Sequence, residues 1–247
     1  MSQRKYIHCT VLLSGVLLSF GAGAAIALSG TRVIYAGAAR EATLGARNTS
    51  EAPFVIQSWV ESTSGGLDVP FMVVPPLVRI DPGKESMLRV IRAGGTLPED
   101  RESVYWLNVK EIPQVPTIAN SLQIAVRSQI KLFYRPPGLD GGQSGPTMLR
   151  WRLMPALATG RCELSVQNAS AFHVTFSGVR VTSTGWRNQD LELRMVAPFS
   201  RQQWILEHCN DNAGFTIQYS IVNDFGANEE VPSFMLRPVS TDPSAGR

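Results

Sequence analysis

The chain of 247 residues is 44% hydrophobic and 17% charged, which supplies enough apolar sequence for one large or two ordinary cores and argues against extensive disorder. Residues 1–27 contain two basic and no acidic side chains, so the remainder carries 21 basic against 20 acidic residues. This near balance, without a dense Lys/Arg block, argues against nucleic acid as a partner.

The N-terminal segment has the layout of a secretory signal. A basic head with Arg4 and Lys5 precedes an apolar run, and two A-x-A patterns end at Ala24 and Ala27. This layout predicts a signal peptide over residues 1–27, cleaved after one of these two alanines. An uncleaved membrane anchor is the alternative, but the apolar run is shorter than the roughly 20 residues that span a bilayer. We therefore expect the mature protein outside the cytoplasm.

Short runs rich in β-branched and aromatic residues fill the first half of the chain. They are separated by turn residues such as Asp81-Pro82-Gly83 and Gly65-Gly66. The runs predict strands at 31–36, 41–48, 53–62, 71–80, 86–93 and 103–112. Together with one further strand they suit an immunoglobulin-like sandwich.

That further strand is predicted over residues 121–136, where apolar side chains from Leu122 to Tyr134 alternate with a face that carries Arg and Lys. Its length exceeds that of an ordinary strand. Two interpretations are open: the apolar stripe packs into the core of its own domain, or the strand is an extended edge that serves a partner.

The segment 137–147 is dominated by Gly and Pro and is predicted to be a linker. Beyond it, a second set of short runs predicts strands at 148–154, 162–168, 173–183, 191–197, 202–208, 214–224 and 233–239. The sequence thus predicts an all-β protein with an N-terminal domain over 28–136 and a C-terminal domain over 148–247.

Two cysteines, Cys162 and Cys209, remain after removal of the signal. In an oxidising compartment this pair favours a disulfide. The alternative is a metal site formed with His173 and His208, but the spacing matches no usual ligand pattern.

The sequence contains no nucleophile and base in a recognisable arrangement, no phosphate-binding loop and no dinucleotide glycine motif. We therefore expect no enzymatic activity, no cofactor, no metal and no small-molecule substrate. Two triplets, Asn48-Thr49-Ser50 and Asn168-Ala169-Ser170, match N-glycosylation acceptors, and we assign them no role.

The segment LPEDRESVYWLNVKEIP, residues 97–113, closely resembles the signature of the periplasmic pilus chaperones of the chaperone/usher pathway. IKLFYRP at 130–136, Thr31-Arg32 and IVNDFG at 221–226 extend the likeness. The resemblance covers the first half well and the second in patches. The short connection from Gln114 to Ser121 resembles that of the short-loop group.

The resemblance implies two immunoglobulin-like sandwiches set at an angle, with a cleft between them. It implies that Arg32 and Lys131 anchor the C-terminal carboxylate of a pilus subunit, and that Leu122, Ile124 and Val126 form a donor strand for that subunit. Because Lys131 has the opposite parity to these three side chains, we treat the anchor and the donor stripe as separate devices.

The resemblance also implies an interdomain ion cluster of Glu102, Arg135 and Asp224. The implied function is that of a non-enzymatic periplasmic chaperone that binds pilus subunits, prevents their aggregation and delivers them to an outer-membrane usher. Self-association of the free protein would hide its exposed edge. The alternative is a secreted immunoglobulin-like adhesin or structural pilus subunit; a secreted hydrolase ranks third because its chemistry is missing.

Overall fold

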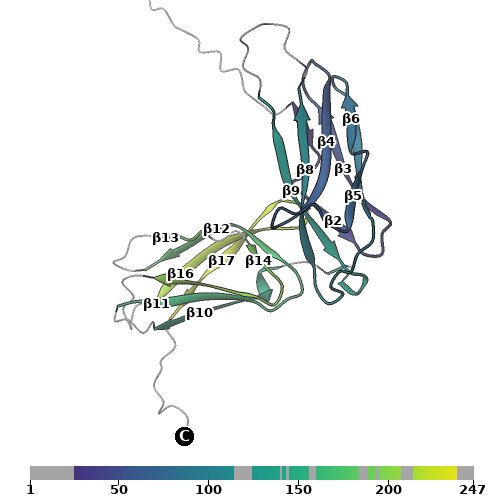
Figure 1. The fold of residues 1–247 in the computed structure, drawn as a ribbon. Coiled ribbons are helices and arrows are strands. Elements are labelled where there is room, and N and C mark those ends of the chain that lie inside the picture. Colours follow the sequence, from purple (N-terminus) through teal and green to yellow (C-terminus); the bar gives the residue numbers. More distant parts are fainter. Residues whose placement is uncertain are drawn as a thin grey trace, which may run out of the picture.

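The computed structural model describes residues 25–113, 124–139, 141–142, 145–155, 160–183, 189–192, 195–206 and 214–237. In these residues the protein consists of two β-sandwich domains set at an angle to each other (Figure 1). The described helices are two single 3₁₀ turns, η1 (Pro137–Leu139) and η2 (Pro146–Met148). The predicted all-β architecture with two immunoglobulin-like domains is confirmed. None of the described helices has the length and apolarity required to cross a membrane.

The first domain contains two facing sheets. One has the order β1 (Ile26–Leu28), β3 (Glu41–Asn48), β7 (Glu85–Arg92) and β5 (Phe71–Val74). The other has the order β2 (Arg32–Ala36), β9 (Arg127–Arg135), β8 (Ser103–Ile112), β4 (Phe54–Ser62) and β6 (Leu77–Ile80). All paired strands are antiparallel except β2 and β9, which run parallel from Arg32 opposite Lys131 to Ala36 opposite Arg135.

The predicted strand over 71–80 is two strands in different sheets. β5 pairs with β7 and β6 pairs with β4, and Pro75 and Pro76 lie between them. Two consecutive prolines lack the N–H groups that a continuous ladder needs, so the chain changes sheets there. The Val74–Pro75 peptide bond is cis.

Strand β9 is shorter than the strand predicted over 121–136, of which residues 121–123 lie outside the described part. Its ladder with β8 begins at Lys110 opposite Arg127, preceded by a single hydrogen bond of 2.8 Å from the Glu111 N–H to the Val126 carbonyl. Pairing ends there because β8 stops at Ile112 and is followed by Pro113, which has no N–H to donate.

Strand β1 overlaps the end of the segment that the sequence assigned to the signal, since Ile26 and Ala27 belong to both. Ile26 pairs with Asn48 of β3, is buried in the core, and donates its N–H to Glu111 Oε1 at 2.9 Å. Cleavage after Ala27 would remove Ile26 and Ala27 from this sheet, whereas cleavage after Ala24 would leave β1 whole.

The alternation along β9 has two outcomes. Leu132 and Tyr134 are buried in the first core, and Ile130 packs against that core from its rim. Ile124, further towards the N-terminus, is 72% exposed, and Val126 is half-buried. The C-terminal part of the apolar stripe therefore packs into the core of the first domain, and its N-terminal part does not.

The second domain has one sheet of β10 (Leu149–Pro155), β11 (Cys162–Asn168) and β15 (Arg201–Leu206). The facing sheet contains β13 (Gln189–Asp190), β12 (Val174–Thr182), β16 (Phe215–Val222) and β17 (Asn228–Leu236), with β14 (Met195–Val196) also paired to β12. The predicted strand over 191–197 is thus reduced to β14, of which residues 193–194 lie outside the described part. Between the sheets lies a second apolar core around Trp151, Phe176 and Tyr219.

Asn48 and Asn168 close the same kind of loop in the two domains. Each ends the second strand of its sheet, is fully buried, and accepts hydrogen bonds on Oδ1 from the N–H and hydroxyl of the serine two residues later. The amide of Asn48 donates to the Ala52 and Ile80 carbonyls, and that of Asn168 donates to three carbonyls of its own domain. The two acceptor-like triplets are therefore internal loop staples, and a glycan on either side chain would require breaking these bonds.

Replacing Asn48 with Ala should lower the free energy of unfolding by about 2 to 4 kcal/mol, because it leaves buried backbone groups without partners. Denaturant unfolding followed by far-UV circular dichroism measures the loss. Gln57→Ala, which removes an exposed amide from β4, should change stability by no more than about 0.5 kcal/mol. Equal small effects of both substitutions would contradict the staple.

Candidate functional site: the interdomain cleft

A buried ion cluster joins the two domains. Arg135, at the end of β9, donates from Nε to Glu102 Oε1 at 2.8 Å and from Nη1 and Nη2 to the two carboxylate oxygens of Asp224 at 2.7 Å each. Nη1 also donates to the Gly142 carbonyl at 3.0 Å. The exposed fractions of the three side chains are 8% for Arg135, 1% for Glu102 and 14% for Asp224. The structure thus brings these three predicted residues together across the domain boundary.

The second carboxylate oxygen of Glu102 reaches into the second domain. Oε2 accepts the backbone N–H of His173 at 2.8 Å and lies 2.9 Å from His173 Nδ1. Because an ionised carboxylate only accepts, Nδ1 carries the shared hydrogen. The His173 ring also packs on Phe133 of β9, with ring centroids 5.7 Å apart.

The charges of this cluster compensate for its burial. Burial alone would lower the pKa of Arg135, but hydrogen bonds to Asp224 and Glu102, and their negative charges, raise its pKa overall. Arg135 therefore stays charged between two carboxylates, and loss of any member leaves a buried charge with fewer partners.

Arg32 and Lys131 lie side by side on the paired strands β2 and β9. Arg32 Nη1 donates to the Val222 carbonyl at 3.0 Å, and Lys131 Nζ donates to Thr175 Oγ1 at 3.2 Å, so both side chains point towards the second domain. Arg32 Nε is buried and has no hydrogen-bond partner. Neither cation has a carboxylate partner among the ion pairs of the described residues.

The surroundings of the two cations favour an anion. Burial, and secondarily the neighbouring Arg32 guanidinium, lower the pKa of Lys131 to about 8. Burial likewise lowers the pKa of Arg32, against the opposing effect of Asp224 and Glu102. Two partly desolvated like charges repel each other, and a carboxylate bound between them would relieve this repulsion. It could also accept a hydrogen bond from the unpaired Nε–H of Arg32.

The free edge of β9 begins at this pair of cations. On one side β9 pairs with β8 from Arg127 to Tyr134, but on the other side β2 covers it only from Lys131 onwards. Residues 127–130 therefore present unpaired backbone groups on that side, at least towards the strands that the structure describes.

A groove of about 740 Å³ follows this edge. One wall is formed by Ser128, Gln129 and Ile130 of β9, and the other by Ile26, Leu28 and the link 29–31 between β1 and β2. Phe225 and Gly226, from the turn between β16 and β17, close the end towards the second domain. The groove is thus the opening between the two sheets of the first sandwich. It is lined by apolar and uncharged polar residues, with unpaired backbone groups of β9 along one side.

The described donor residues lie outside the groove, in the segment that leads into β9. Ile124 is exposed and Val126 is half-buried, both N-terminal to β9, and Leu122 lies outside the described residues. The two described members are thus not used by the core of their own domain.

Of the four residues considered for a disulfide or a metal site, the structure describes Cys162 and His173. Cys162 is fully buried at the start of β11, and His173 contacts Glu102 in the ion cluster. Cys209 and His208 lie outside the described residues, so the Cys162–Cys209 disulfide stays a prediction. No group of metal-binding side chains occurs within the part of the chain that was described.

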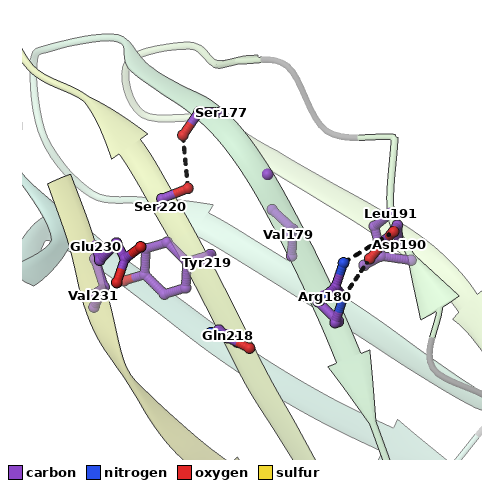
Figure 2. A pocket seen from close by; sticks show the side chains of 11 residues that line it. Ser177, Val179, Arg180, Asp190, Leu191, Gln218, Tyr219, Ser220, Glu230 and Val231 are labelled. Carbon is purple, nitrogen blue, oxygen red and sulfur yellow. Dashed lines mark hydrogen bonds and ion pairs between the residues drawn. The ribbon is translucent and has the colours of Figure 1, made fainter. Parts of the chain in front are cut away.

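A second cavity, of about 480 Å³, lies on the outer face of β12, β16 and β17 (Figure 2). Its polar groups bind one another: Arg180 donates to Asp190 at 2.8 Å, and the hydroxyls of Ser177 and Ser220 are 2.6 Å apart. Arg180 and Asp190 are both exposed, so solvent screens their ion pair and it contributes little to stability. The groove beside Arg32 and Lys131 is therefore the better candidate site, because its cations lack acidic partners among the described residues.

Comparisons with known proteins place this architecture in a family. The family described as "Pili and flagellar-assembly chaperone, PapD N-terminal domain" matches residues 25–140, and "Pili assembly chaperone PapD, C-terminal domain" matches residues 145–233. Both sandwiches are thus accounted for by domains of one class of protein. The chain belongs to the PapD family of pili assembly chaperones and is a fimbrial chaperone.

Individual relatives agree over nearly the whole length. Chaperone protein LpfB of Salmonella typhimurium is 38% identical over 230 residues, covering 92% of this chain and 95% of LpfB. The crystal structure of the YadV chaperone is similar with a TM-score of 0.69 and 32% identity, covering 86% of this chain and all of YadV. The SafB chaperone of Salmonella enterica, solved in complex with the SafA pilin, gives a TM-score of 0.62 at 29% identity, covering 85% of this chain and 94% of that one.

Sequence reasoning did not find several partners of the site residues. His173, Thr175 and the Val222 carbonyl contact Glu102, Lys131 and Arg32 across 71, 44 and 190 positions of the chain. No local pattern marks such long-range contacts, and a lone histidine on a strand carries no signal of its own. His173, which lies directly before β12, is recognisable as a site residue only once the contact between the domains is known.

Replacing Arg135 with Ala should lower the free energy of the first unfolding transition by about 3 to 5 kcal/mol, because Glu102 then stays buried without its cation. Calorimetry measures the transition, and small-angle scattering reports whether the domains separate. Arg79→Ala removes a cation from an exposed pair, 65% and 59% exposed, and should change stability little. An Arg135 variant as stable as the Arg79 variant would refute the structural role of the cluster.

Proposed function

We propose that the protein binds a pilus subunit in the interdomain groove, anchoring the subunit's C-terminal carboxylate on Arg32 and Lys131. The observation that carries this proposal is the pair of adjacent cations without a described acidic partner, at the point where the free edge of β9 begins. A terminal carboxylate held by two cations gains charge-assisted hydrogen bonds and fixes the register of the strand that precedes it.

The free edge of β9 would then pair with the subunit. Backbone N–H and C=O groups supply hydrogen bonds without regard to sequence, and alternate side chains enter the subunit's own hydrophobic groove. The proposed donors are Leu122, Ile124 and Val126. Burial of each would stabilise the complex by about 1.5 to 3 kcal/mol before the cost of ordering the segment. The exposure of Ile124 supports this role, since an apolar edge without a partner favours aggregation.

The setting of this function follows from the family and from the N-terminal segment. We propose that the protein works in the periplasm after removal of its signal, prevents subunits from aggregating and delivers them to an outer-membrane usher. No cofactor, metal or nucleotide is required, because formation of the shared sheet supplies the free energy. The SafB–SafA complex of a similar chaperone supports subunit binding.

The alternative of an adhesin or structural pilus subunit is less well supported. Both sandwiches match chaperone domains, and the relatives named above are chaperones.

A pull-down from the periplasm of the producing organism tests the proposal. The tagged wild-type protein should recover small secreted subunits, and Arg32→Ala/Lys131→Ala should lose them. The control Arg79→Ala/Lys84→Ala removes two exposed cations and should recover the same subunits as the wild type. Circular dichroism verifies that all variants are folded. Identical eluates from the anchor variant and the wild type would overturn the proposed anchor.

Subunit binding should weaken as the pH rises from 7 to 9. The pKa of Lys131 is lowered to about 8, so the free protein loses the ammonium charge in this range, whereas a bound carboxylate favours the protonated form. Association at high pH then requires proton uptake, and the affinity should fall about tenfold between pH 7 and pH 9. Isothermal titration with a recovered subunit measures the change.

The matched control for the pH experiment is Lys131→Arg, which keeps its charge throughout this range. Its affinity should be nearly constant between pH 7 and pH 9. An equally steep decline for Lys131→Arg would show that another group governs the pH dependence.

A further inference from the structure

Phe225 is an exposed aromatic side chain at the end of the candidate groove. It is 87% exposed and lies on the turn between β16 and β17, in the second domain. Together with Gly226 it lines the same groove as Ser128, Gln129 and Ile130 of β9. Its exposed fraction is the highest among the large hydrophobic side chains of the described residues. Single exposed apolar residues are ordinary on protein surfaces, so it is the place of Phe225 at the end of the groove that indicates a contact.

The turn that carries Phe225 is held on three sides. Asn223 Oδ1 accepts the N–H groups of Phe225 at 3.1 Å and Ala227 at 3.0 Å. Asp224 binds Arg135 through both oxygens. Gly226 has a φ of 83°, and a Cβ atom at that position would lie 2.4 Å from Thr31 Oγ1, so the turn rests directly on the first domain.

These contacts fix the backbone of Phe225 relative to Arg32 and β9 although it belongs to the other domain. An aromatic side chain on a fixed backbone has only its two side-chain torsions left to order on binding, and aromatic residues often dominate binding free energies.

The direction of a bound strand follows from the anchor. If its terminal carboxylate lies at Arg32 and Lys131 and its backbone pairs with residues 127–130, the strand runs towards Lys131, in the same direction as β9. Its last few residues then lie beside Ser128 to Ile130. These are the residues of β9 that share the groove with Phe225.

We propose that Phe225 is a specificity-determining contact of the second domain, which packs against an apolar side chain one to three residues before the C-terminus of the bound subunit. The occupant is the C-terminal strand of a pilus subunit, so this inference rests on the proposed function. Ile26, Leu28 and Ile130 contribute apolar surface to the groove, and the rest of its lining is uncharged, so an aliphatic or aromatic side chain is favoured over a charged one. An aromatic side chain should be preferred because two rings attract each other beyond the area that they bury.

Synthetic peptides with a free C-terminal carboxylate and alternating apolar residues test the inference by fluorescence anisotropy. Three peptides carry a single Phe one, two or three residues before the last position, and a fourth carries Ala at all three positions. At least one Phe peptide should bind the full-length wild type about five- to tenfold more tightly than the Ala peptide. In Phe225→Ala this preference should vanish, so that the Phe peptides and the Ala peptide bind with equal affinity.

Two control proteins separate this inference from the proposed anchor. Phe199→Ala removes another exposed phenylalanine of the second domain, 50% exposed and not part of the groove, and should keep the preference. Arg32→Ala/Lys131→Ala should lose all four peptides, as should the wild type when the peptides end in an amide.

The outcomes are distinguishable. A preference retained in Phe225→Ala, with binding still dependent on the carboxylate, overturns the role of Phe225 and leaves the anchor intact. Binding that is unaffected by amidation, or absent for every peptide, overturns both. Conversion of a wild-type dimer to a monomer by Phe225→Ala, without a change in peptide preference, would assign the exposed ring to self-association and overturn the inference.

Discussion

The shared contact of Arg135 with Glu102 and Asp224 is the interaction on which the geometry of the cleft depends. Arg135 ends the strand that carries Lys131, and Asp224 lies next to Phe225 in the turn between β16 and β17. One guanidinium thus positions groups from both domains around the same groove. Because its charge is buried and matched by two carboxylates, the contact has a narrow range of geometries, and the domains are oriented more strictly than by an apolar interface alone.

The sequence predicted elements well where a local pattern determines them. Alternation located most strands of both sandwiches. Of the two interpretations that it left open for the apolar stripe, core packing holds from Ile130 to Tyr134. It could not show that 71–80 divides between two sheets, because that depends on which neighbouring strands are available for pairing. It also could not show where β9 leaves its core, since this is decided by the end of β8 and by Pro113, on a different part of the chain.

The candidate site was predictable only through the resemblance to a family. Composition and spacing alone do not place Arg32 beside Lys131, 99 positions apart in the sequence, in neighbouring positions of a parallel strand pair. The same holds for His173, which has an ordinary strand environment in the sequence and a partner in another domain. The two Asn-x-Ser triplets show the reverse case: a motif with a familiar chemical meaning turned out to serve loop closure in both domains.

The parallel pairing of β2 with β9 gives the groove a fixed end. β2 already occupies the edge of β9 from Lys131 onwards, so a strand bound to the free edge could not extend past this residue. The C-terminal residue of each bound strand would therefore set its register along β9. In the proposed complex, β2 therefore limits how far the bound strand can extend along β9. A chaperone with this geometry could bind subunits of differing sequence. Each subunit would need the same number of residues between its C-terminus and the strand that pairs with β9.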